Sequence, residues 1–286
     1  MYYLLSLLSG ILISFMIALN GGLTNEYGVY SATVIIHIIG LILIAIVTLF
    51  KREKIIFKKI KWYLYFGGAI GVLTTIFLNL AFSRISVTSI LALGLFGQSI
   101  IGLIIDQYGL LSMPKHTFQK SKIIGLVFVL CGIVSLLENF DTLAVIVSFI
   151  AGINLVLSRT LNAKLAEYTS VRISTFYNYF TGLFFAIIVY FILGKNELML
   201  TNFSFSPKIY IYFGGIIGVC IILLSNIIVV KISSFYLSLF IFIGQVFSGI
   251  LIDIFISQIF SFRNMIGGLF VTIGLCINIL LEKKYK

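Results

Sequence analysis

Two very apolar stretches of the chain carry the same pattern of polar residues. Residues 97–106 read "GQSIIGLIID", and residues 244–253 read "GQVFSGILID". In each stretch a Gln, a Gly and an Asp are spaced four apart, so one face of a helix carries all three. An amide can hydrogen-bond a solute or a neighbouring helix, and a carboxylate can bind a proton or a cation. The six residues are Gln98, Gly102 and Asp106 in the first stretch and Gln245, Gly249 and Asp253 in the second.

The depth of these residues in a bilayer separates the two chemistries. A charge at the bilayer centre costs about 3 kcal/mol or more, and it normally faces protein or water. Asp106 and Asp253 end their stretches, where this cost is smaller, and they are the candidate proton sites. Gln98 and Gln245 lie deeper and cannot reach water directly. Two interpretations stay open for them: they line a central cavity, or they hydrogen-bond an adjacent helix.

The composition excludes a soluble protein and several classes of function. Of the residues, 60% are hydrophobic and 10% are charged, whereas soluble domains carry about 25% charged residues. The net charge is +11, but Lys and Arg cluster between apolar runs, which indicates membrane orientation and not nucleic-acid binding. No GxxxxGKS/T phosphate loop occurs, so the chain has no ATPase of its own.

The chemistry-bearing residues do not group into a catalytic or metal-binding set. The sequence has two His and three Cys, and the Cys lie inside apolar runs without disulfide or metal spacing. The two Asp of the repeated pattern lie in separate stretches. We therefore expect no enzyme activity, no metal and no cofactor.

Membrane-spanning helices must position these residues. A span needs about 20 mostly apolar residues, and continuous runs that do not alternate with polar residues predict helices and not barrel strands. The sequence therefore predicts an all-α polytopic membrane protein with ten transmembrane helices. The expected spans are 2–20, 31–50, 62–83, 86–106, 122–138, 142–161, 173–194, 209–230, 234–253 and 264–281.

The positions of the cationic residues predict the orientation. Sixteen of the 20 Lys and Arg fall on the side of the N-terminus, most of them in segments 51–61, 115–122 and 159–172 and at the C-terminus. Cytoplasmic loops carry the excess of Lys and Arg. We therefore expect a multi-pass protein of the cell (plasma or inner) membrane with both termini in the cytoplasm.

The chain is predicted to contain one five-helix unit twice, in the halves 1–138 and 142–286. "YFGGAIGV" (65–72) matches "YFGGIIGV" (212–219) at the same offset of 147 as the opening pattern, and other matches have an offset of 142. Five is odd, so the second unit enters the membrane inverted. Inverted repeats are typical of secondary transporters, whose substrate site lies near the midplane between the halves.

With these features in view, the chain resembles the drug/metabolite transporter (DMT) superfamily, and within it the YdcZ-type inner-membrane exporter family with two units in tandem. The resemblance rests on "IALNGGL" in the first helix, "GGxxG" in the third, and "GQxxxGxxID" followed by "QYGLL" in the fourth. It covers essentially the whole chain. It implies an EamA-like ten-helix fold with a central cavity and the export of small molecules. Small multidrug exporters of the superfamily carry a Glu in the first helix, whereas residues 2–20 contain no acid.

Further residues inside the spans are candidates for the cavity wall or for helix packing. Thr75 and Asn79 share a helix face, and Asn226 is the counterpart of Asn79. His37 is membrane-embedded, and it either carries protons or is packed and hydrogen-bonded. Glycines in GxxxG spacing let helices approach closely. These glycines are Gly67 and Gly71 in one half and Gly214 and Gly218 in the other, and we expect Gly102 and Gly249 to pack similarly.

Charged residues near helix ends predict two alternating gates. Under the expected topology, Arg84 and Asp253 lie near the outer surface, and Lys231 and Asp106 lie near the inner one. Each pair takes one residue from each half, so one pair would close while the other opens. Ordinary interfacial charges that reach water are the alternative. Asn20 would join the outer gate and Asn162 the inner one.

The sequence thus predicts a secondary-active transporter that exports a small metabolite or drug-like solute by alternating access. The expected partners are the small-molecule solute, the lipid bilayer and a proton or sodium ion for coupling, in a monomer or a homodimer. The alternative is a non-transporting membrane partner or a lipid-flipping scaffold. An apolar groove open to lipid would favour that alternative, and a closed, polar central cavity would favour transport.

Overall fold

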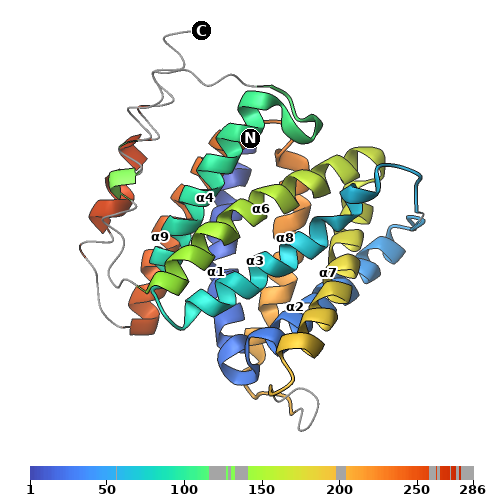
Figure 1. The fold of residues 1–286 in the computed structure, drawn as a ribbon, viewed down its shortest axis with the longest axis horizontal. Helices are drawn as coiled ribbons and strands as arrows, with labels where there is room; N and C mark the ends of the chain where they lie inside the picture. Colours follow the sequence, from blue (N-terminus) through green and yellow to red (C-terminus); the bar gives the residue numbers. More distant parts are fainter. Residues whose placement is uncertain are drawn as a thin grey trace.

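In the computed structural model, the described residues form a bundle of long helices and contain no strand (Figure 1). The first half contributes α1 (Tyr2–Tyr27), α2 (Val29–Phe50), α3 (Gly67–Phe82) and α4 (Val87–Tyr108), and the second contributes α6 (Thr142–Tyr168), α7 (Val171–Leu193), α8 (Phe213–Ile228) and α9 (Ser234–Ser257). Short 3-10 turns are η1 (Trp62–Phe66), η2 (Leu110–Ser112) and η3 (Ile209–Tyr212). The structure describes residues 1–55, 57–115, 141–197 and 204–257, with short stretches inside 127–132 and 262–277.

The prediction of an all-α polytopic membrane protein is confirmed. Within the described part of the chain, 8 helices are long and apolar enough to cross a membrane, when η1 is counted with α3 and η3 with α8. The predicted spans 122–138 and 264–281 lie largely outside the described residues. The remaining predicted spans each coincide with one of these helices.

Two glycines end helices where the chain must turn sharply. Gly28, with φ 89°, joins α1 directly to α2, and Gly109, with φ 61°, ends α4 in the left-handed region. A side chain is strained in both backbone conformations. At Gly28 a Cβ would also collide with the carboxylate of Glu197, which lies against the turn.

Most of the packing joins one half of the chain to the other. α1 packs on α9, α3 and α4 pack on α6, α2 packs on α7, and α4 packs on α9. Glycines bring the backbones together at two equivalent places. Gly10 of α1 lies against the carbonyl of Ile241, and Gly152 of α6 lies against the carbonyl of Gly94. Small residues allow this close approach in a membrane, where apolar burial does not drive helices together.

α4 and α9, which are counterparts in the repeat, run antiparallel. Asp106 near the end of α4 accepts a hydrogen bond from the backbone N–H of Ser234 at the start of α9 (3.1 Å). Asp253 near the end of α9 accepts one from the backbone N–H of Val87 at the start of α4 (3.2 Å). An inverted repeat requires this antiparallel arrangement.

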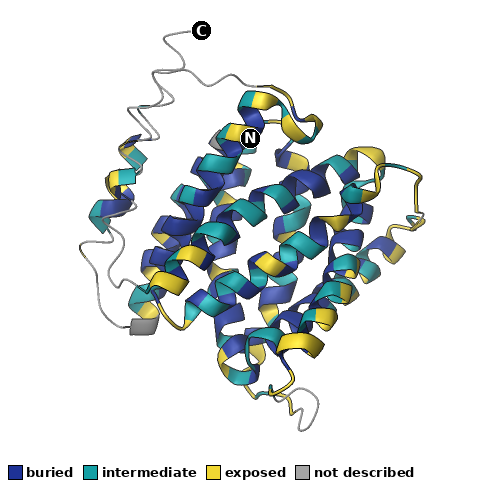
Figure 2. Cartoon of the chain, in the orientation of Figure 1, coloured by how far each residue is buried: buried dark blue, intermediate teal, exposed yellow. Residues whose placement is uncertain are grey.

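The outer surface of the bundle is apolar, and polar side chains gather inside it. Exposed residues lie around the outside of the bundle (Figure 2). On α7 they include Phe180, Phe184, Phe191 and Ile192, which are 52–66% exposed. Such a surface suits lipid and would be unfavourable in water. Inside the helices many hydroxyls are satisfied locally, as when Thr33 donates to the carbonyl of Val29.

Candidate substrate cavity

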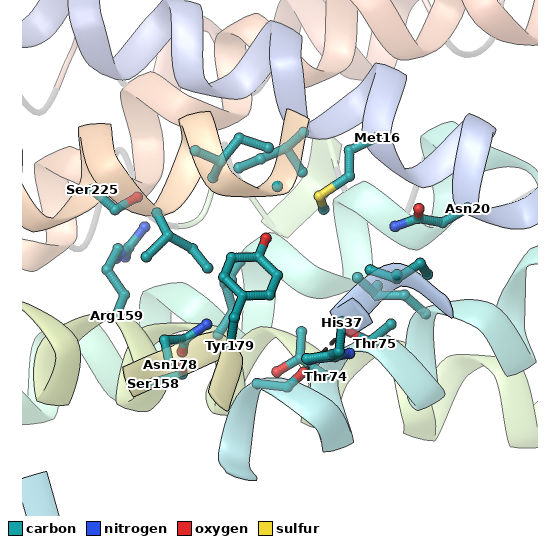
Figure 3. A pocket seen from close by; sticks show the side chains of 18 of the residues that line it. Met16, Asn20, His37, Thr74, Thr75, Ser158, Arg159, Asn178, Tyr179 and Ser225 are labelled. Carbon is teal, nitrogen blue, oxygen red and sulfur yellow. Dashed lines mark hydrogen bonds between the residues drawn. The ribbon is translucent and has the colours of Figure 1, made fainter. Parts of the chain in front are cut away.

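A cavity of about 120 Å³ lies between the two halves, enclosed by α1, α2, α3, α6, α7 and α8 (Figure 3). It has room for several water molecules, since one occupies roughly 10–15 Å³ by the same measure. None of the described residues on its wall is acidic. Its polar wall residues are Asn20, His37, Thr74, Thr75, Asn79, Ser158, Arg159, Asn162, Asn178, Tyr179, Ser225 and Asn226.

An aromatic pair, His37 on α2 and Tyr179 on α7, lies on the cavity wall where the halves meet. Their ring centroids are 5.8 Å apart, and the two residues are counterparts in the repeat. Gly182 receives the His37 ring and Gly40 receives the Tyr179 ring, because a Cβ at either glycine would overlap that ring. Nδ1 of His37 donates to the carbonyl of Thr33 at 2.8 Å, since a carbonyl can only accept.

Two asparagines occupy equivalent places on α3 and α8. The amide nitrogen of Asn79 donates to Oγ1 of Thr33 (3.4 Å), and that of Asn226 donates to Oγ1 of Thr175 (3.2 Å). Oδ1 of Asn226 accepts no hydrogen bond from the described residues. A buried amide oxygen without a partner is costly. This atom can therefore accept a hydrogen bond from a solute or water in the cavity.

The first glycine of each GxxxG motif faces an asparagine from the opposite half. Asn20 of α1 lies against Gly214 of α8, and Asn162 of α6 lies against Gly67 of α3. The amide nitrogen of Asn162 also donates to Oδ1 of Asn178 at 2.7 Å. The second glycines, Gly71 and Gly218, lie on the cavity wall.

Arg159 is a buried cation on the cavity wall. Arg159 is 5% exposed, and its Nη2 donates to Oγ of Ser238 at 3.1 Å. Its Nε donates to no described residue. The charge of Asp106 acts on Arg159, but Asp106 does not line the cavity. The described wall of the cavity therefore carries a cationic group and no carboxylate of its own.

The structure places Gln98 and Gln245 away from the cavity wall. α4 and α9, which carry them, contribute none of the residues that line the cavity. Gln245 lies where α9 packs on α1, with its carbonyl accepting from Oγ of Ser14 at 3.1 Å. Oε1 of Gln98 and Oε1 of Gln245 accept no hydrogen bond from the described residues. The tight glycine contacts hold α4 and α9 against α6 and α1, one layer outside the cavity.

The two glycines that lie four residues after these glutamines are Gly102 in α4 and Gly249 in α9. Gly102 is buried in α4. Gly249 of α9 lies close to the side chain of Leu91 on α4, where a Cβ would come within 3.0 Å of its Cδ1. The contact at Gly249 therefore joins α9 to α4.

Three of the four charged residues predicted as gates, Arg84, Asp106 and Asp253, have other partners in this structure. Arg84 forms an ion pair with Asp141 (3.0 Å). Asp253 accepts from the backbone N–H groups at the start of α4, at 3.1 Å from Thr88, and from the Thr88 hydroxyl. Lys231 lies with Asp106 on the wall of a second pocket. The ion pairs Arg84–Asp253 and Lys231–Asp106 stay predictions for another conformation.

Two further carboxylates bind the starts of α2 and α7 from the opposite half. Glu197, which follows α7, accepts from the backbone N–H and the hydroxyl of Ser31 at 2.7 and 2.9 Å. Glu53, which follows α2, accepts from the hydroxyl of Ser170 and from Arg172, both at 2.6 Å. The Ser170 hydroxyl and the Arg172 guanidinium lower the pKa of the Glu53 carboxyl.

Sequence reasoning missed Arg159, and the reason is visible in α6. The apolar run ends near residue 161, so Arg159 counts as a cation of the loop 159–172. The helix continues to Tyr168 and keeps Arg159 inside the protein. The missed signal is the continuous helical sequence of 153–168, which contains neither Gly nor Pro.

The family model described as "Putative inner membrane exporter, YdcZ" matches residues 1–135 and again 143–277. The chain belongs to this family. Two tandem matches to one model agree with the two-repeat architecture of the DMT superfamily. The YdcZ family is a family of membrane exporters by its description, and that description names no enzyme class.

Solved structures share the fold of this YdcZ-family chain. One of them, described as "Crystal structure of protein", matches with a TM-score of 0.72 and 12% sequence identity, over 100% of this chain and 98% of that chain. At this identity the likeness concerns the fold alone. No curated protein matches the sequence.

Proposed function

We propose that the chain is a secondary-active transporter that moves a small solute through the central cavity by alternating access, in the export direction that its family description indicates. The observation that carries the proposal is the cavity itself. It lies between the halves, and counterpart residues line it, as with Asn79 and Asn226 or Asn20 and Asn162. Sites of inverted-repeat transporters lie at such an interface.

In this proposal the moving contacts are the two antiparallel ends of the α4–α9 pair. Asp106 holds the start of α9 at one end, and Asp253 holds the start of α4 at the other. Opening one end of the cavity would loosen one of these contacts and leave the other in place. Lys231 and Arg84 are then the cations that would pair with the released carboxylates.

The test is solute flux in proteoliposomes across a panel of labelled metabolites and drug-like compounds. Gly71→Leu fills the cavity, because Gly71 lies on its wall. Leu73→Phe adds bulk to the outer surface of the same helix, where Leu73 is 43% exposed. We expect flux with the wild type and with Leu73→Phe, and its loss with Gly71→Leu. Equal flux in both variants, or none for the whole panel with folded wild-type protein, would overturn the proposal.

A further inference from the structure

The two ends of the cavity differ in chemistry although their residues are counterparts in the repeat. At one end the second half of the chain supplies a cation, an amide and two hydroxyls. At the other end the equivalent positions of the first half carry apolar side chains, which lie next to Asn20 (Figure 3). The polar set is Ser158, Arg159, Asn178 and Ser225, and the counterparts are Met16, Ile17, Ile36 and Leu78.

The close view of the cavity separates these two ends. Arg159 and Ser225 lie at one side and Met16 lies at the opposite side (Figure 3). The four polar residues are all at least nine-tenths buried, with exposures of 4–7%. An exact repeat would make both ends of the cavity alike. Only the second half carries the polar set, so a solute with one polar and one apolar end would bind in one orientation.

Arg159 is the residue that requires an explanation. A buried charge is costly unless it is paired and hydrogen-bonded. Within the described part of the chain Arg159 forms no ion pair, its Nη2 meets only the hydroxyl of Ser238, and its Nε has no acceptor. Asp106 offsets part of the charge from outside the cavity, but it accepts the backbone N–H of Ser234.

We infer that the solute is an amphipathic organic anion, bound with its carboxylate at Arg159 and its apolar part against Ile17 and Met16. This inference rests on the proposed transport function. A guanidinium is the side chain best suited to a carboxylate, and charge-assisted hydrogen bonds are the stronger kind. The hydroxyl of Ser225 can donate to the same anionic group, whereas the hydroxyl of Ser158 donates to the carbonyl of Gly67 at 2.7 Å. An anion also supplies the missing partner of a charge that the fold already buries.

The test compares three probes of one shape: 4-phenylbutyrate, 4-phenylbutanamide and 4-phenylbutylammonium. Their binding to the purified full chain is measured by thermal shift and by equilibrium dialysis. The carboxylate is expected to bind at least about tenfold more tightly than the amide, because hydrogen bonds between charged groups are stronger than those to a neutral group. The ammonium probe is expected not to bind. This comparison uses the wild type and needs no variant to fold.

Variants then assign the effect to Arg159. Arg159→Gln should remove the preference for the carboxylate, and Arg159→Lys should keep part of it. Arg172→Gln removes the same charge at a surface ion pair with Glu53 and should leave the preference unchanged. Ile17→Asn should weaken phenylbutyrate while leaving the ratio of carboxylate to amide affinity in place.

The outcomes distinguish this inference from the proposed function. Equal binding of the three probes, tighter binding of the amide or the ammonium, or a carboxylate preference that survives Arg159→Gln would overturn the anion inference. Each of these results would leave flux through the cavity intact. Loss of all flux with retained carboxylate binding would instead contradict transport.

Discussion

At the scale of single residues, the repeated glycine motif has a more specific role than close helix packing. Gly67 and Gly214 each face an asparagine from the other half, so each glycine makes room for one amide. The sequence shows the motif and shows the asparagines, but their partnership joins positions about a hundred or more residues apart. Only the folded arrangement of the two halves brings them together.

A matched pair of glycine substitutions on α3 tests this contact. A Cβ at Gly67 would overlap the Asn162 amide, which would have to leave Asn178, whereas at Gly71 the nearest atom, Oγ of Ser158, is 3.5 Å away. We expect Gly67→Ala to destabilise the protein by about 1–3 kcal/mol and Gly71→Ala to change stability little. Thermal unfolding in detergent measures both. Equal melting temperatures for the two variants would show that Asn162 has room to move aside.

At the scale of secondary structure, helix starts are held by carboxylates from the opposite half. Asp106 and Asp253 hold the starts of α9 and α4, and Glu197 holds the start of α2. Glu53 binds Ser170 and Arg172 at the start of α7. A negative charge at a helix N-terminus is favourable because the first N–H groups have no partner in the helix. A carboxylate bound at a helix start therefore occurs at α4 and α9, and again at α2 and α7, which are corresponding helices of the two halves.

The Glu53 contact predicts a pH dependence of stability. Its carboxyl has a pKa below the ordinary value of 4.5, so its contribution is complete above pH 4.5 and is lost as the pH falls through the lower, folded-state pKa. Glu53→Gln should therefore lower the melting temperature at pH 6, and the difference from the wild type should shrink as the pH falls below 4.5. Glu167→Gln, at an exposed carboxylate paired with Lys164, is the control and should have a small effect. A Glu53→Gln difference that is constant with pH would contradict the assignment.

The existence of the helices could be predicted from the sequence, and their ends could not. α1 and α6 continue to Tyr27 and Tyr168, although their apolar runs end near residues 20 and 161. Hydropathy marks where lipid contact ends, whereas these final segments include buried polar residues, such as Thr24 and Asn162, that pack against protein. For the same reason the sequence indicates a cavity with Asn79, Asn226, Thr75 and His37 but leaves Arg159 in a loop.

At the scale of the whole molecule, each described helix packs mainly against helices of the other half. The offsets of 142 and 147 predict two units, and the glycine spacings predict close helix contacts. Neither the offsets nor the glycine spacings indicate which helices pack together, because small residues allow two helices to approach closely but do not specify which two. Consequently the position of α4 and α9 outside the cavity, with Gln98 and Gln245, could not be predicted.

Alternating access through the cavity is the central claim, and two-sided access to its wall tests it most directly. Thr75→Cys places a thiol on the wall, in a background in which the native cysteines Cys131, Cys220 and Cys276 are replaced by Ser. A membrane-impermeant thiol reagent is applied to right-side-out and to inside-out vesicles. Phe184→Cys, at a residue 60% exposed on the outer surface of α7, reports labelling that does not pass through the cavity. The account predicts that Thr75→Cys is labelled from both sides and that added solute slows the labelling. Labelling of Thr75→Cys from one side only, whatever the solute, would contradict it.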